Sequence, residues 1–77
     1  MRVVLDIETN LAWNRIWLVG LYTETGESIA CYSAEELEKT LGRLSCTKLI
    51  GHNLVGFDLP RLYEIWGWEP RGLEIID

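Results

Sequence analysis

The residues best suited to chemistry are two acids near the start of the chain, Asp6 and Glu8. Apolar and polar residues alternate from Val3 to Glu8, which predicts a β-strand. Residues two apart in a strand point to the same side, so we expect both carboxylates to project from one face. Neighbouring carboxylates repel each other, and a hard cation such as Mg²⁺ or Mn²⁺ would relieve that repulsion. The alternative is a strand end that carries two ordinary surface acids.

A third acid, Asp58, lies near a predicted helix start. Pro60 fits only in a first helical turn, which places that start near Asp58. The preceding apolar range 47–50 predicts a short strand, and the crossover that leads to it favours a parallel alignment with the first strand. Ligands gather where strand ends and helix starts meet in such sheets. Three carboxylates could therefore converge there. The alternative for Asp58 is a plain helix N-cap, a role that does not exclude metal binding.

The range 13–23 predicts a second strand. It is apolar on both sides, which is typical of a strand in a sheet that is covered on both faces. The range 23–27 contains Gly26 and predicts a hairpin turn into a third strand at 28–32. We therefore expect the first three strands to form an antiparallel meander.

Two helices are predicted after the meander. Ser33 and Glu36 form a capping box, and the helix that follows has an apolar face of Leu37, Leu41 and Leu44. The second helix, near Asp58, has a similar predicted face and ends at Gly67. That second face consists of Leu59, Leu62, Tyr63 and Trp66. The range 73–77 predicts the beginning of another strand.

Composition limits the functions that remain. A chain of 77 residues forms one small domain, and its net charge of −5 has the wrong sign for an electrostatic phosphate binder unless metal ions supply positive charge. The four Trp favour packing, with base stacking as the alternative. Cys31 and Cys46 lack metal-binding spacing and are expected to be free thiols. Without a membrane-length apolar run or a signal peptide, we expect a cytoplasmic protein.

The acidic segments resemble the motifs of a known nuclease family. Asp6-Ile7-Glu8-Thr9 is similar to the first motif of the DEDD proofreading exonucleases, and the range 53–58 is similar to their second motif, Asn-x-x-x-(Phe/Tyr)-Asp. The start of the chain most resembles the N-terminal 3′–5′ exonuclease domain of phage family A DNA polymerases. The spacing also fits archaeal and viral family B polymerases. The resemblance implies an α/β, ribonuclease H-like fold, with 1–77 as a partial exonuclease domain.

The same resemblance implies roles for particular residues. Asp6, Glu8 and Asp58 would be catalytic and would hold two Mg²⁺ or Mn²⁺ ions, with Asp6 bridging both. Substrate binding would involve a further set, of which the last three could instead serve in the core or as caps: Thr9, Asn10, His52, Asn53 and Phe57. The family's third motif, a Tyr or His with a fourth carboxylate, would follow Asp77.

The implied reaction is hydrolysis of the 3′-terminal phosphodiester of DNA by two metal ions. The implied partners are a single-stranded DNA 3′ end and a DNA polymerase domain or downstream polypeptide, with no membrane, in a bacterial or phage-infected cell. Because the chain resembles only the front part of an exonuclease domain, we expect its activity alone to be weak or nil. Two alternatives remain: a catalytically inactive interaction module of the same fold, and a ribonuclease H-like nuclease acting on RNA.

Overall fold

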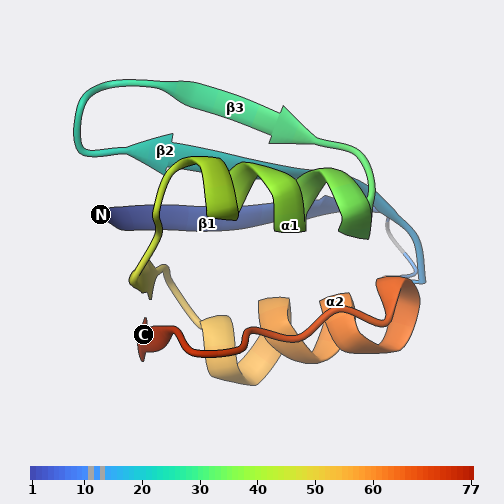
Figure 1. Cartoon of the computed structure of the whole chain (residues 1–77). Coiled ribbons are helices and arrows are strands. Elements are labelled where there is room, and N and C mark those ends of the chain that lie inside the picture. Colours follow the sequence, from blue (N-terminus) through green and yellow to red (C-terminus); the bar gives the residue numbers. More distant parts are fainter. Residues whose placement is uncertain (11, 13) are drawn as a thin grey trace.

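The computed structural model describes residues 1–10, 12 and 14–77, whose strands form one sheet in the order β3-β2-β1-β4-β5 (Figure 1). In chain order the elements are β1 (Arg2–Thr9), β2 (Ile16–Thr23), β3 (Ser28–Cys31), α1 (Ala34–Arg43), β4 (Lys48–Ile50), the π-helical turn η1 (Leu54–Asp58), α2 (Leu59–Trp66) and β5 (Glu74–Ile76). The first three strands form the expected antiparallel meander, and β4 is parallel to β1. The predicted α/β, ribonuclease H-like arrangement is confirmed. Trp13, where the second strand was expected to begin, lies outside the described residues.

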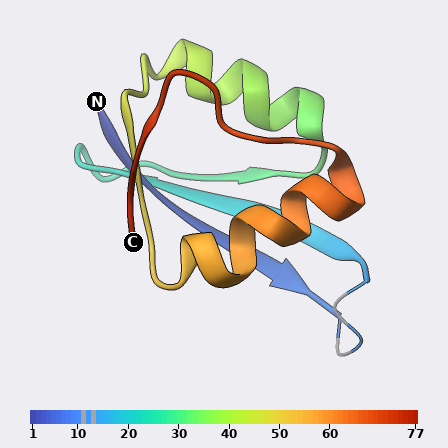
Figure 2. The same cartoon turned by 90° about the horizontal axis from the view of Figure 1, so that it is seen from below.

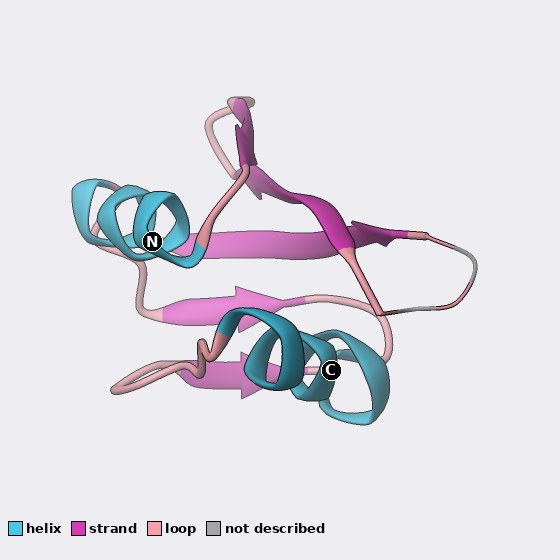
Figure 3. Ribbon diagram, turned by 90° about the vertical axis from the view of Figure 1, so that its right-hand side faces the viewer, coloured by secondary structure: helices cyan, strands magenta, loops and turns pink. Residues whose placement is uncertain are grey.

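The alternation along β1 separates its two faces as predicted. Val3, Leu5 and Ile7 are buried, whereas Asp6 and Glu8 are exposed. The last segment also becomes a strand, because β5 pairs with β4 in parallel. The sheet is twisted, so that β2 and β3 turn away from β4 and β5 (Figure 3).

Helix α1 begins at the predicted capping box. The Glu36 backbone N–H donates to the Ser33 hydroxyl at 3.1 Å, and the Glu36 carboxylate accepts from the Tyr32 N–H at 2.6 Å. The first contact satisfies an amide that the first helical turn leaves without an intrahelical partner, and the second ties the chain just before the cap to the helix. Leu37 and Leu41 are buried on the face that α1 turns toward the sheet.

Both helices pack on the face of the sheet that carries Val3, Leu5 and Ile7. Leu37 from α1 and Leu62 from α2 join these residues in one hydrophobic core. The red segment that follows α2 runs between the two helices (Figure 2). Within it, the Trp68 indole N–H donates to Glu38 of α1 at 2.8 Å, which links the two helical regions. In the described part of the chain, no helix is both long enough and apolar enough to span a membrane.

The opposite face of the sheet is open, contrary to the expectation that the second strand is covered on both sides. The register of β1 with β2 places Val4, Asp6 and Glu8 beside Tyr22, Gly20 and Leu18, and both Val4 and Tyr22 are exposed. Among the described residues no helix packs on this face, because both helical crossovers pass over the other one. Two other side chains that were expected to pack in apolar surroundings, Trp17 and Tyr63, are also exposed.

We expect the open face to drive self-association, because an exposed apolar surface and unpaired strand edges favour it. Sedimentation velocity over a concentration series should show reversible oligomers, and Tyr22→Lys should reduce them. The matched control is Tyr63→Lys, which changes another exposed Tyr, on α2. A chain that stays monomeric at high concentration, or equal effects of the two substitutions, would contradict this prediction.

Candidate functional site

The candidate site lies where β4 ends beside the longer strand β1. β4 pairs with β1 only from Arg2 to Val4, so the later part of β1 has no strand partner on that side among the described residues. The side chain of Asp58 pairs with this part of β1 instead of a strand: its Oδ2 accepts a hydrogen bond from the Ile7 backbone N–H at 3.2 Å. A buried side chain thus satisfies an amide that a longer β4 would have paired.

The Asp58 carboxyl has an altered acidity. Its pKa is raised from 3.8 to about 6, chiefly because burial removes water from the charged form, while the Ile7 N–H acts in the opposite direction. The negative charges of Asp6 and Asp77 raise this pKa further. Asp58 is therefore mostly ionised at pH 7 but poorly solvated.

Asp6 and Glu8 both project from the open face of the sheet, as the alternation predicts. Asp6 lies opposite Gly20 on β2, and Glu8 lies opposite Leu18. Glu8 also lines a shallow hollow of about 270 Å³ whose floor includes Gly20. The space around the two acids is therefore open to solvent and to a ligand.

The predicted convergence of three carboxylates is only partly present. Asp6 and Asp58 interact electrostatically, but no three His, Cys, Asp or Glu side chains of the described residues form a group that could hold a metal ion. The geometry explains this, since Asp58 is directed at a backbone amide while Asp6 and Glu8 point outward. The donor chemistry still fits Mg²⁺ or Mn²⁺, which accept carboxylate oxygens and retain water in the remaining positions. The metal ligands remain a prediction.

Two of the predicted substrate-binding residues lie at the end of β1: Thr9 is its last residue and Asn10 follows it. Thr9 pairs with Ile16 next to an irregularity in the register. The side-chain oxygen of Asn10 accepts hydrogen bonds from the backbone N–H groups of Asn14 and Arg15, at 3.1 and 3.2 Å. Asn10 thus has a structural role in holding the turn between β1 and β2.

His52, Asn53 and Phe57 lie on the segment that leads to Asp58. Asn53 has a left-handed backbone, with φ of 58°, and its carbonyl accepts from the Phe57 N–H at 2.9 Å. The Phe57 ring has the Arg61 guanidinium 5.8 Å from its centroid, while His52 is exposed. These residues lie near Asp58 along the chain, and their substrate contacts remain predictions.

Two features of this region were not predicted. The helix starts at Leu54 with a π-helical turn, four residues before the expected start, and Asp77 binds the backbone of that start. A sequence signal for Asp77 does exist. It follows a short apolar strand that could pair in parallel with 47–50, and the carboxyl ends of parallel strands meet at helix starts.

Comparisons with known proteins show similarity of fold. No family model matches the chain, and no curated protein matches its sequence. Among solved structures, it is similar to the family B DNA polymerase of the hyperthermophilic archaeon Pyrobaculum calidifontis, with a TM-score of 0.77 and 15% sequence identity. The match covers 99% of this chain and 15% of the polymerase chain. Nearly the whole chain therefore has the fold of a small part of a DNA polymerase.

Proposed function

We propose that the chain contributes the acidic site of a polymerase-associated 3′–5′ exonuclease, which hydrolyses the terminal phosphodiester of a DNA strand with Mg²⁺ or Mn²⁺. The observation that carries this proposal is the buried, poorly solvated carboxylate of Asp58 next to Asp6. A desolvated anion beside a second anion gains free energy when a cation binds, so perturbed pairs of this kind are typical of functional sites. The polymerase-like fold supports the same assignment.

The roles of the residues follow from their positions. Asp58 is held by the Ile7 amide, so its carboxylate keeps one orientation, and its charge interacts with that of Asp6. Asp6 and Glu8 would add oxygens from the open face, where DNA can approach. When bound, the metal ions supply charge stabilisation and an activated water. The protein side chains supply position and negative charge.

Calorimetric titration with Mn²⁺ at pH 7.5 tests the proposal. We expect weak binding, because few protein oxygens reach the ion, and Asp6→Ala or Asp58→Asn should weaken it by about tenfold or more, as expected for loss of a charged ligand. Glu35→Ala is the control, since it removes an acid from α1 whose side chain is 77% exposed. Mn²⁺ affinity that is unchanged by substitution of Asp6 and Asp58, or the absence of Mn²⁺ binding, would exclude the proposed site.

Digestion of a 5′-labelled oligonucleotide tests the reaction. Any Mn²⁺-dependent shortening from the 3′ end should be slow and should disappear in Asp58→Asn. A matched ribonucleotide strand separates DNA from RNA as the substrate, because only RNA presents the 2′-hydroxyl. Faster cleavage of the ribonucleotide strand would favour the RNA nuclease alternative.

A catalytically inactive interaction module of the same fold is the second candidate. Two observations favour it: the three acids do not form one group in the described residues, and the open sheet face exposes Val4 and Tyr22. This candidate predicts that Asp6→Ala changes neither Mn²⁺ affinity nor DNA cleavage. The titration described above therefore distinguishes the two candidates.

A further inference from the structure

Asp77 binds the start of the helical segment that carries Asp58. Its two carboxylate oxygens accept hydrogen bonds from the backbone N–H groups of Leu54 and Val55, at 2.9 and 3.0 Å. These contacts bridge more than twenty residues of sequence and join the end of β5 to the first turn of η1. A carboxylate at a helix start is favoured because the amides there point outward and carry partial positive charge.

The topology of the sheet explains why Asp77 reaches this turn. β4 and β5 are parallel, and the Gly51 N–H donates to the Ile76 carbonyl at 3.1 Å just past the end of β4. The chain leaving β4 therefore passes Asp77 before it enters η1. Asn53 occupies the usual capping position, but its side chain makes no capping hydrogen bond in the described structure. Asp77 provides that capping interaction.

The short segment from Leu54 to Asp58 is thus fixed at both ends. Asp77 holds its first two amides, and the Asp58 carboxylate at its other end accepts from the Ile7 N–H of β1. The side chain of Leu54, the first residue of the segment, is also fully buried in the core. A shift of the first turn would move Asp58 relative to Asp6, because the segment is one continuous helical unit.

We propose that Asp77 is a positioning residue, which holds the 54–58 turn so that the Asp58 carboxylate stays against β1 beside Asp6. The inference that this affects metal binding rests on the function proposed above. Both oxygens of Asp77 are occupied by backbone amides, so its role differs from that of a metal ligand. Residues that orient a ligand in this way commonly affect metal affinity strongly.

Amide hydrogen exchange in the full 77-residue chain tests the positioning. In Asp77→Ala we expect the Leu54 and Val55 amides to exchange about tenfold faster, the size expected for loss of a helix cap. The decisive amide is that of Ile7, which is far from Asp77 in sequence and is protected by Asp58. Its exchange should accelerate as well if Asp77 positions Asp58.

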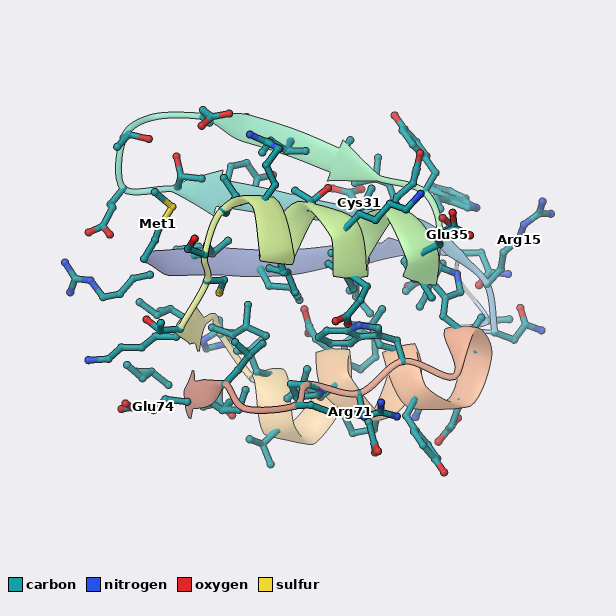
Figure 4. All side chains as sticks on the ribbon, in the orientation of Figure 1. Met1, Arg15, Cys31, Glu35, Arg71 and Glu74 are labelled. Atoms are coloured by element: carbon teal, nitrogen blue, oxygen red, sulfur yellow. The ribbon has the colours of Figure 1, made fainter. Side chains whose placement is uncertain are left out.

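Two further variants control the test. Asp77→Asn keeps one acceptor oxygen without the charge, so its exchange rates should lie between those of the wild type and Asp77→Ala. It also replaces Asp77→Ala if that variant does not fold. Glu74→Gln removes an acid three residues earlier, on β5, whose side chain is exposed in an ion pair with Lys48 (Figure 4). It should leave all three amides unchanged.

Mn²⁺ titration of the same variants adds a functional measurement. Affinity should fall by about tenfold in Asp77→Ala and be partly restored in Asp77→Asn, the range reported for residues that orient metal ligands. Equal losses in both variants would indicate that Asp77 itself binds the ion, and would overturn the inference. Unchanged Ile7 exchange in Asp77→Ala would also overturn it. If the wild type binds no Mn²⁺, the proposed function fails, while Ile7 exchange still decides the positioning role.

Discussion

The Asp58→Asn variant is expected to be more stable than the wild-type protein at neutral pH. The Asp58 carboxylate is buried and lies near the charges of Asp6 and Asp77, which together raise its pKa to about 6. An amide of the same shape removes this charge and can still accept the Ile7 N–H. A rise of about two pKa units corresponds to at most about 3 kcal/mol, and the new N–H₂ group needs a partner, so we expect a gain of about 1–2 kcal/mol.

The gain should depend on pH with a definite sign. Because the pKa of Asp58 is higher in the folded state than its ordinary value of 3.8, the folded state binds the proton more tightly. The contribution of Asp58 to the free energy of unfolding is therefore most favourable below about pH 4, and this contribution is lost as the pH rises through about 6. The advantage of Asp58→Asn should be full at pH 7 and small at pH 4. Glu24, whose pKa is lowered chiefly by a hydrogen bond from the Arg2 backbone amide, does not act on Asp58 and cancels in the difference.

Urea unfolding in the presence of a chelator at pH 4, 5, 6 and 7 measures this difference. Glu35→Gln is the matched control, because it neutralises an exposed acid in an ion pair with Lys39, and such pairs contribute less than about 1 kcal/mol. If Asp58→Asn instead lowers the free energy of unfolding, and does so equally at pH 4 and pH 7, the charge of Asp58 does not destabilise the folded protein. The stored repulsion that favours metal binding would then be absent.

Features set by local periodicity were predictable from the sequence. The alternation of Val3, Leu5 and Ile7 fixed the buried face of β1, and the Ser33–Glu36 pair fixed the start of α1. Gly67 ends α2 with a left-handed backbone, as its type suggested. In each case the neighbours along the chain are enough to determine the outcome.

Features set by contacts distant in sequence were not predictable. The pairing of Asp58 with the Ile7 amide depends on where β4 stops, which no local pattern gives. The start of the π-helical turn likewise contacts Asp77, which lies 23 residues after Leu54. Tyr63 fits an apolar helical face by spacing alone, yet it is exposed, because α2 is covered on only part of that face. The acids could be named from the sequence, but their mutual geometry could not.

The second large effect is expected from Gly51→Ala, at the point where β4 gives way to the helical segment. A Cβ at Gly51 would lie 2.8 Å from the Leu5 carbonyl oxygen and 2.6 Å from a methyl carbon of Leu54. Leu5 belongs to the central strand, and Leu54 is fully buried, so neither can move freely. We expect a loss of about 2–3 kcal/mol, the upper part of the range typical of overpacking a core. That is a large share of the roughly 4–12 kcal/mol expected for a chain of this length.

Gly42→Ala provides the matched control, because it makes the same chemical change without a clash. A Cβ at Gly42 would meet nothing within 4 Å, and Gly42 lies in helix α1. Alanine favours a helix over glycine by about 1 kcal/mol, so this variant should become more stable. Guanidinium unfolding of both variants should therefore give changes of opposite sign. Equal stability of Gly51→Ala and the wild type would mean that Gly51 can move away from Leu5 and Leu54 without a loss of stability. The close approach of β1 to the segment carrying Asp58 would then contribute nothing to the position of the site.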